Sequence, residues 1–141
     1  MIVVDTNIIV HLHITGEWTE QVLKVLQKDP AWYSPPLWQS EFRNVLGGIM
    51  RKKVITLEQA RQIMEAARET MTGREVPVPP DRVLELVSAC SCSAYDCEFV
   101  ALAKELGVKL ITLDRQILAC FPGTAMNPGE FIGSSISQSK G

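Results

Sequence analysis

The chain has 141 residues, of which 46% are hydrophobic and 21% are charged, and its formal net charge at pH 7 is −2. A chain of this length forms one domain that buries roughly 70% of the surface of its unfolded state, and the composition is that of a soluble globular protein. The uncharged apolar runs are far shorter than the roughly 20 residues of a membrane-spanning helix, and a carboxylate stands at position 5, where a signal peptide would carry basic residues. We therefore expect a cytoplasmic protein that does not enter a membrane.

Hydrophobic periodicity, helix-capping residues and Pro or Gly stops divide the first half of the chain into strands and helices. In chain order these are a strand at residues 2–4, a helix that closes near Gly16, a helix from Thr19 to Pro30, a strand at 32–33, a helix that starts at Ser34-Pro35 and runs to about Lys52, and a helix from the capping box at Thr56 to Gly73.

The second half continues the alternation. Its expected elements are an edge strand at 75–78, a helix at 81–87, a helix from Ser93 to Gly107, a strand at 109–112, a short helix, and a short strand at 124–126. Strands that alternate with helices predict an α/β fold, a doubly wound parallel sheet sandwiched by helices. We expect a single domain over residues 1–132, followed by a disordered tail at 133–141, which is rich in Ser, Gly, Gln and Lys.

The four cysteines do not have the spacing of a common zinc site. They stand at positions 90, 92, 97 and 120, with one residue between the first two and four before the third. The simpler interpretation is a set of reduced thiols in the core of a cytosolic protein.

Two acids end predicted strands. Asp5 follows the apolar run at 2–4, and Asp114 follows a similar run at 109–113. In open α/β sheets, ligands bind at the carboxyl ends of the strands, so Asp5 and Asp114 would share one crevice if the two strands are neighbours.

Two further acids lie beside apolar helix faces. Glu41 is one helical turn from Leu37 and one from Val45, and it therefore borders the buried stripe. Asp96 lies in the first turn of its helix, next to Tyr95, which we expect to face the core. Each acid also has an ordinary structural explanation. Asp5 and Asp114 would cap helices, Asp96 would complete a capping box with Ser93, and Glu41 would pair with Arg43.

Convergence of the four acids would have an electrostatic consequence. Carboxylates about 5 to 8 Å apart repel each other by roughly 2 to 3 kcal/mol per pair at an effective dielectric constant near 20. Several such pairs rival the roughly 5 to 15 kcal/mol stability of a whole domain, so the cluster must take up protons or bind a cation. Oxygen ligands without His or Cys favour Mg²⁺ or Mn²⁺, and a water on such an ion is a usable nucleophile.

The chain resembles a known family in four motifs that occur in order. They are Asp5-Thr6-Asn7 after the first strand, Glu41 in the helix that follows Ser34-Pro35, Tyr95-Asp96 at the start of a helix that ends in Lys-Glu-Leu-Gly, and Leu-Ile-Thr-Leu before Asp114. Together, over about residues 1 to 132, they are similar to the PIN-domain ribonucleases, and most of all to the VapC toxins of prokaryotic toxin-antitoxin pairs.

The resemblance implies an endoribonuclease that depends on Mg²⁺ or Mn²⁺. By this likeness Asp5, Glu41, Asp96 and Asp114 would hold the metal or position its water, and Thr6, Asn7 and Thr112 would be supporting polar groups. Glu98 is a possible extra acid only, because it lies on a different helix face from Asp96. Family members typically form homodimers and are blocked by a cognate antitoxin that covers the active-site groove.

Basic residues supply candidate contacts to RNA phosphates. If four of the 16 acids are metal ligands, 12 acids remain against 14 basic residues, a balance of +2. An ordinary solvated face with local ion pairs would look similar. Tryptophans 18, 32 and 38 would stack on bases or, more commonly for such residues, fill the core. The candidate phosphate contacts are Arg43, Arg51, Lys52, Lys53, Arg61, Arg68 and Arg115.

Other chemistries remain open. His11 and His13 could cleave RNA without metal and leave a cyclic phosphate, whereas water activated by metal leaves a 5′-phosphate and a 3′-hydroxyl; however, residues two apart on a helix point in different directions. A phosphatase with Asp5 as nucleophile would need a second Asp where Asn7 stands. A non-catalytic interaction module on the same fold, and an RNA-processing nuclease that is not a toxin, are the remaining alternatives.

Overall fold

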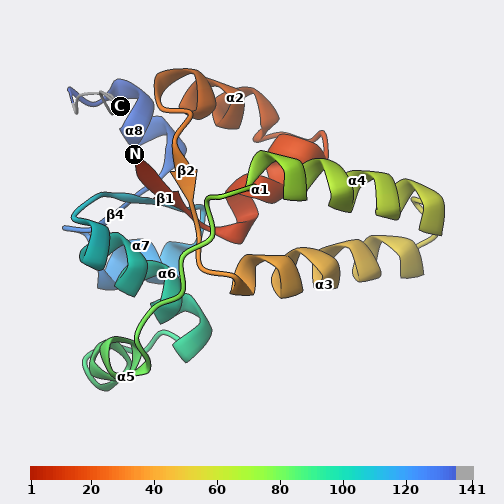
Figure 1. Ribbon diagram of the computed structural model, residues 1–141. Helices are drawn as coiled ribbons and strands as arrows, with labels where there is room; N and C mark the ends of the chain where they lie inside the picture. Colours follow the sequence, from red (N-terminus) through yellow and green to blue (C-terminus); the bar gives the residue numbers. More distant parts are fainter. Residues whose placement is uncertain (136–141) are drawn as a thin grey trace.

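The computed structural model describes residues 1–135 (Figure 1). In chain order the elements are β1 (Ile2–Val4), α1 (Thr6–His13), α2 (Thr19–Lys28), β2 (Trp32–Tyr33), α3 (Leu37–Arg51), α4 (Leu57–Thr70), α5 (Pro80–Ser88), α6 (Ala94–Leu106), β3 (Leu110–Ile111), α7 (Arg115–Cys120), β4 (Ala125–Met126) and α8 (Pro128–Gly133).

The sheet has four parallel strands in the order β2-β1-β3-β4. Its centre is β1, which pairs with β2 on one side and with β3 on the other, and Val4 lies opposite Ile111. The residues of β1 and β3 are all buried, as expected for a parallel sheet that is covered on both faces. This confirms the predicted α/β class and places the carboxyl ends of β1 and β3 side by side.

Helices cover both sides of the sheet. Figure 1 shows α1, α3 and α4 on one side of the strands and α5, α6 and α7 on the other. The helices α3 and α4 run back along each other and extend beyond the sheet as an arm. None of the helices within residues 1–135 is long and apolar enough to cross a membrane.

The core contains two of the three tryptophans. The side chains of Trp32 and Trp38 are 1% and 0% exposed, so they pack in the interior and do not present a surface for stacking on bases. Trp18 is partly buried and packs against the same core. The expectation that large aromatic residues fill the core is thus confirmed for Trp32 and Trp38.

The predicted edge strand at 75–78 is wrong. Only Glu75 forms a bridge, with Ser34, and the backbone N–H of Val76 donates to the carbonyl of Ser34 over 3.1 Å. Pro77 then interrupts the pairing because it has no N–H to donate.

Ser34 begins no helix, contrary to the prediction. Its backbone N–H donates to the carbonyl of Arg74, and its buried hydroxyl donates to the carbonyl of Val4 over 2.5 Å. Because these bonds hold Ser34 at the sheet, the helix begins only at Leu37.

The C-terminal end of the described chain packs against α2. The ammonium group of Lys28 donates to the carbonyls of Phe131 and Ser134, at 2.5 and 2.8 Å, and lies over the ring of Phe131. Of the predicted tail, Gly133 is the last residue of α8, and residues 136–141 lie outside the described part. The domain boundary at residue 132 stays a prediction.

Replacing Ser34 by Ala tests the link between this residue and β1. We expect Ser34→Ala to lower the free energy of unfolding by roughly 1–3 kcal/mol, because the buried carbonyl of Val4 loses its hydroxyl donor. Chemical denaturation measures the difference. Ser88→Ala is the control, since its hydroxyl makes a similar bond to a carbonyl at an exposed position, and we expect a change within about 0.5 kcal/mol. Equal effects in the two variants would contradict the assigned role of Ser34.

Candidate active site

Asp5 is held rigidly at the end of β1. Its carboxylate is 6% exposed and caps α1: one oxygen accepts from the backbone N–H of Thr6 at 2.7 Å, and the other accepts from the hydroxyl of Thr112 at 2.7 Å. The backbone N–H of Asp5 donates to the carbonyl of Ile111, the last residue of β3. The end of β1 and the loop after β3 therefore fix the position of this carboxylate together.

Asn7 and Thr112 tie the ends of β1 and β3 together. The side-chain oxygen of Asn7 accepts from the backbone N–H of Leu113 at 3.2 Å, and its NH₂ group lies 3.4 Å from both Asp5 Oδ2 and Thr112 Oγ1. The hydroxyl of Thr112 also accepts from the backbone N–H of Asp114 at 3.0 Å. The predicted supporting residues thus form one hydrogen-bond network across the two strand ends.

Glu41 reaches this network from α3. Its Oε1 accepts from the hydroxyl of Thr6 at 2.6 Å, and its side chain is half-buried. The expected alternative partner, Arg43, instead donates to the hydroxyl of Ser40 at 3.1 Å. Thr6 therefore connects the start of α1 to an acid that lies 35 residues away in the sequence.

Asp96 and Asp114 both lie at helix starts. Asp114 caps α7, and its Oδ1 accepts from the backbone N–H groups of Gln116 and Ile117 at 2.9 and 3.0 Å. Asp96 lies in the first turn of α6, where its backbone N–H donates to the hydroxyl of Ser93, the N-cap. Asp114 can therefore cap α7 and still contribute its side chain to the site.

One pocket brings the four predicted acids together. It has a volume of about 600 Å³, and Asp5, Glu41, Asp96 and Asp114 line it together with Thr6 and Asn7. We call it the acid pocket. Thr112 does not line it but lies behind Asp5, to which it donates. None of the seven candidate RNA-binding residues lines it, although Arg43 and Arg115 are close in sequence to Glu41 and Asp114.

Burial and, to a smaller extent, neighbouring carboxylates raise the pKa values of Asp5, Glu41 and Asp96. Burial, with smaller contributions from Glu41 and Asp96, raises the pKa of Asp5 to about 7, even though Thr112 and Thr6 oppose the shift. Burial and Asp96 raise the pKa of Glu41, and burial and Asp114 raise that of Asp96. At neutral pH these groups hold protons more readily than ordinary carboxylates, as expected for an acidic cluster without a cation.

A neighbouring acid is linked to the cluster but lies outside the pocket. The pKa of Glu98 is raised by burial and by the charge of Glu41, yet Glu98 lines a different hollow, next to α5. This agrees with its expected place on another face of α6.

The donor set fits a hard divalent cation. All four acids offer carboxylate oxygens, which Mg²⁺ and Mn²⁺ prefer. No group of three or more Asp, Glu, His or Cys side chains within residues 1–135 is placed so that it could hold a metal ion. A cation in the pocket would therefore be held by one or two of the carboxylates, with waters and substrate phosphates as its other ligands, which is how Mg²⁺ is usually bound.

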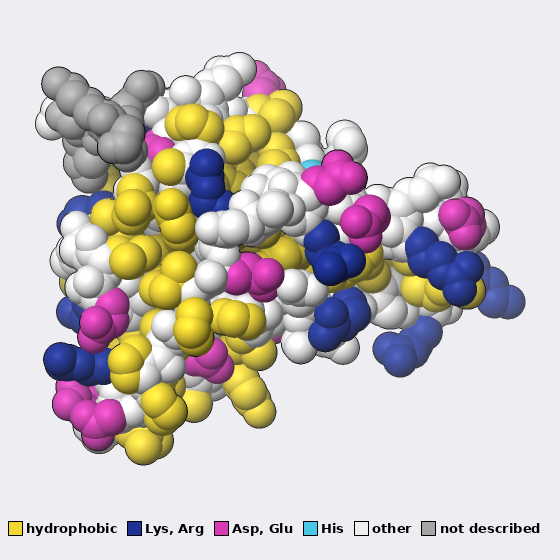
Figure 2. Space-filling view, in the orientation of Figure 1, with side chains coloured by type: hydrophobic (Ala, Val, Ile, Leu, Met, Phe, Trp, Pro, Cys, Tyr) yellow, Lys and Arg dark blue, Asp and Glu magenta, His cyan; other side chains and the backbone are white. Residues whose placement is uncertain are grey.

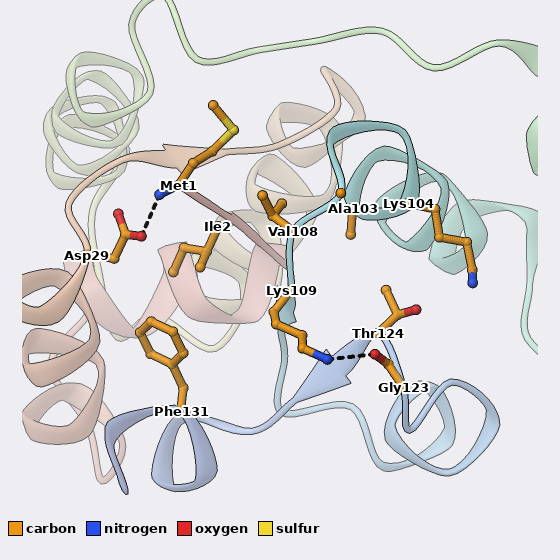
Figure 3. Close-up of a pocket in the computed structure, with 11 residues that line it drawn as sticks. Met1, Ile2, Asp29, Ala103, Lys104, Val108, Lys109, Gly123, Thr124 and Phe131 are labelled. Carbon is orange, nitrogen blue, oxygen red and sulfur yellow. Dashed lines mark hydrogen bonds and ion pairs between the residues drawn. The ribbon is translucent and has the colours of Figure 1, made fainter. Parts of the chain in front are cut away.

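A second hollow lies at the other ends of the strands (Figure 3). Residues that precede β1, β3 and β4 line it, and its volume is about 490 Å³. Its one acid, Asp29, forms an ion pair with the N-terminal ammonium group at 2.5 Å, and the ammonium of Lys109 donates to the carbonyl of Gly123 at 2.7 Å. The four predicted acids are thus confined to the carboxyl ends of the strands.

The family of the chain follows from comparison with known proteins. A family model described as the PIN domain matches residues 2–120. The chain belongs to the PIN domain family. The sequence is 27% identical over 124 residues to ribonuclease VapC3 of Pyrobaculum aerophilum, and the match covers 86% of this chain and 95% of that protein.

Solved structures share the PIN fold. The crystal structure of PAE2754 from Pyrobaculum aerophilum matches with a TM-score of 0.70 at 19% identity, over 93% of this chain and 92% of that one. The crystal structure of FitAcB from Neisseria gonorrhoeae matches with a TM-score of 0.73 at 18% identity, over 92% of this chain and 99% of that one. FitAB bound to an IR36 DNA fragment matches with a TM-score of 0.69 at 18% identity, over 91% and 95% of the two chains.

Several residues of this PIN domain line the acid pocket without having been predicted. Tyr95, expected in the core, is 63% exposed and lines the pocket from the first turn of α6. Ser40 and Asn44 of α3 also line it. Asn44 lies three residues after Glu41 and therefore on the same helix face, and Ser40 lies one turn before Asn44, so helical spacing was the available signal.

The two histidines of the PIN domain do not share a site. His11 lines the acid pocket, and its Nδ1 is buried without a hydrogen-bond partner among residues 1–135. His13 instead contacts α4, where its Nε2 lies 2.9 Å from the hydroxyl of Thr70. Burial lowers the pKa of both residues. This separation argues against a mechanism with paired histidines.

The basic residues of the PIN domain gather mainly on the arm formed by α3 and α4. Figure 2 shows Lys and Arg side chains along this arm, and all seven predicted RNA-binding residues are exposed. Two of them fit the solvated-face interpretation, since Arg61 pairs with Glu58 at 3.6 Å and Arg68 with Glu65 at 3.2 Å.

The raised pKa of Asp5 predicts how the metal-free protein responds to pH. Because the folded-state pKa of about 7 lies above the ordinary value of 3.8, the folded state is favoured by protonation, and stability falls as pH rises from about 4 to 7. Three pKa units correspond to about 4 kcal/mol as an upper bound. We therefore expect Asp5→Asn to be more stable than the unmodified protein at pH 8 in EDTA, by a few kcal/mol, with a shallower pH dependence in denaturation experiments.

The same variant tests cation binding. Mg²⁺ at about 100 times its Kd adds about 2.7 kcal/mol to stability, so it should raise the Tm of the unmodified protein and not that of Asp5→Asn. Asp29→Asn changes a buried acid at the opposite ends of the strands and should keep the metal response. A metal-independent Tm in the unmodified protein, or an equal shift in Asp5→Asn, would contradict this account.

Proposed function

We propose that this PIN domain is an endoribonuclease that depends on Mg²⁺ or Mn²⁺ and hydrolyses RNA phosphodiester bonds. The observation that carries the proposal is the meeting of Asp5, Glu41, Asp96 and Asp114, from four separate segments, in one pocket, where burial and neighbouring charges raise the pKa values of Asp5, Glu41 and Asp96. Such a cluster is costly without a cation. The similarity to ribonuclease VapC3 supports the choice of RNA as substrate.

In the acid pocket, the four acids would hold the cation or position its water. The bound ion would neutralise phosphate charge and lower the pKa of a water molecule. The protein fixes the positions of these carboxylates. Thr112 and the backbone N–H of Thr6 hold Asp5. The hydroxyl of Thr6 donates to Oε1 of Glu41, so that Oε2 stays available to the pocket. Asn7 keeps the two strand ends in register. Because no side chain forms a covalent bond to substrate in this scheme, Asp5 does not act as a nucleophile.

The walls of the acid pocket suit a strand with unpaired bases. Val10, Leu37 and Val45 form an apolar side, and the ring of Tyr95 stands exposed beside Asp96. Bases stack on aromatic rings with little dependence on sequence, at roughly 1–3 kcal/mol per base. The basic residues of the arm lie outside the pocket, where they would contact phosphates on either side of the cleaved bond.

The second part of the proposal is that the protein is the toxin of a toxin-antitoxin pair. It rests on the similarity to ribonuclease VapC3 and on the four family motifs. We propose that a cognate antitoxin covers the acid pocket, where the apolar side offers it a surface, and that two copies of the chain form a homodimer. An RNA substrate would place the protein in the cytoplasm.

Replacing Asp96 by Asn tests the catalytic role. We expect RNA cleavage in Mg²⁺ to fall on the order of 100-fold or more, because the cation loses a negatively charged ligand. Gel assays of a labelled single-stranded RNA measure the rate, and products should carry 5′-phosphate and 3′-hydroxyl ends.

Asp81→Asn is the matched control, since Asp81 also lies in the first turn of a helix but is exposed and away from the pocket. It should keep full activity. Full activity in Asp96→Asn, or cyclic phosphate ends, would refute the mechanism. Growth arrest on expression of the unmodified protein, absent with Asp96→Asn, is expected for a toxin; normal growth with active enzyme would favour an RNA-processing role.

The salt dependence of RNA binding tests whether basic residues of the arm contact RNA phosphates. In the inactive Asp96→Asn background, Arg51→Ala with Lys52→Ala should weaken binding of single-stranded RNA. It should also lower the slope of log K against log salt by about 1.4, or about 0.7 per lost phosphate contact. Lys24→Ala with Lys104→Ala removes the same charge elsewhere and should leave the slope unchanged. Equal slopes in both double variants would exclude the arm from RNA binding.

A further inference from the structure

The four cysteines come together beside the acid pocket although they belong to three segments. Cys90 and Cys92 lie in the loop between α5 and α6, Cys97 lies in the first turns of α6, and Cys120 ends α7. The sulfur atoms of Cys90 and Cys97 are 3.7 Å apart, and the backbone N–H of Cys92 points at the sulfur of Cys90 over 3.4 Å. All four are free thiols.

We infer that Cys90 and Cys97 are an oxidisable dithiol, a modification site that forms a reversible intramolecular disulfide with hydroperoxides. The two sulfur atoms are already in contact at 3.7 Å, and bond formation requires them to approach to about 2.05 Å. Cys90 lies in a loop and Cys97 on a helix, so movement of the loop can supply this approach without unwinding α6.

The different burial of the two thiols sets the order of the chemistry. Cys97 is 0% exposed, whereas Cys90 is half-buried, so a peroxide reaches Cys90 first. The sulfur of Cys90 attacks the peroxide, an S–O bond forms as the O–O bond breaks, and water or an alcohol leaves. The thiol of Cys97 then displaces water from the oxidised sulfur, forms the S–S bond and loses its proton. Two thiols lose two electrons, which the peroxide takes up, and a dithiol reductant reverses the process.

Cys120 is the competing thiol. Its sulfur lies 3.7 Å from the hydroxyl of Ser91, and hydrogen bonds from Ser91 lower its pKa. The side chain of Gln116 donates to the carbonyl and hydroxyl of Ser91 at 2.9 and 3.1 Å and so keeps this loop residue next to α7. Cys120 should therefore react readily with alkylating reagents, while the Cys90–Cys97 contact favours the disulfide.

A disulfide between Cys90 and Cys97 would affect the acid pocket through Asp96. Cys97 follows Asp96 directly, and Ser93, which caps α6, lies between Cys90 and Cys97 in the chain. The bond would tie the turn that carries Asp96 to the preceding loop. Formation of the disulfide itself requires no nuclease activity, so its test is independent of the proposed function.

Peptide mapping of the full-length folded protein tests the inference. The protein is treated with hydrogen peroxide, its remaining thiols are blocked with N-ethylmaleimide in denaturant, and it is digested with trypsin. Cys90, Cys92 and Cys97 share the peptide 83–104, whereas Cys120 lies in 116–140. We expect peptide 83–104 to be two hydrogens lighter, with one blocked thiol, and dithiothreitol to restore three.

Single variants identify the bonded pair. Cys90→Ser and Cys97→Ala should each abolish the lighter peptide, whereas Cys92→Ser and Cys120→Ser should keep it. Three blocked thiols in peptide 83–104 after oxidation would overturn the inference, as would a cross-link between the two peptides. A lighter peptide that forms only in protein unfolded with urea before oxidation would also overturn it, because the folded contact would then play no part.

Discussion

The cost of burying Asp5 among other carboxylates at the end of β1 is the constraint around which the acid pocket of this PIN domain is arranged. Asp5 is buried, and the charges of Glu41 and Asp96 add to the cost of ionising it. A protein tolerates such a cluster only when protons or a cation compensate for it. Hydrogen bonds from neighbouring residues hold the side chains of Asp5, Glu41 and Asp114 in place.

The same residues serve the fold and the site. Asp5 and Asp114 cap α1 and α7, and Thr112 both donates to Asp5 and accepts from the backbone N–H of Asp114. Structural and functional explanations of these acids are therefore not alternatives. Capping fixes one oxygen of each carboxylate against the helix backbone, which limits its rotation. A pocket assembled from capping residues needs few further residues for support.

The sequence predicted best the features that depend on residues close together in the chain. The apolar runs before Asp5 and Asp114 predicted strands and the helices after them, because a short buried strand and its cap lie within one stretch of chain. The exposure of Tyr95 depends on which segments pack against the start of α6, and the predicted strand at 75–78 is reduced to the single bridge between Glu75 and Ser34. These features arise from packing between distant segments, which the periodicity of a single segment does not record.

The acid pocket and the basic residues of the arm lie on different parts of the surface. This separation of charge would orient the proposed RNA substrate as it binds. The acid pocket repels phosphate when its carboxylates are ionised, whereas Arg51, Lys52 and Lys53 on the arm attract it. Screening limits such forces to about 8 Å at physiological salt, so the arm would act on phosphates outside the pocket and would not pair with the carboxylates inside it. Had these basic groups lain within the pocket, they would have paired with the acids and displaced the ion. In the proposed function, keeping the two sets apart would allow one surface to bind the RNA backbone and another to cleave it.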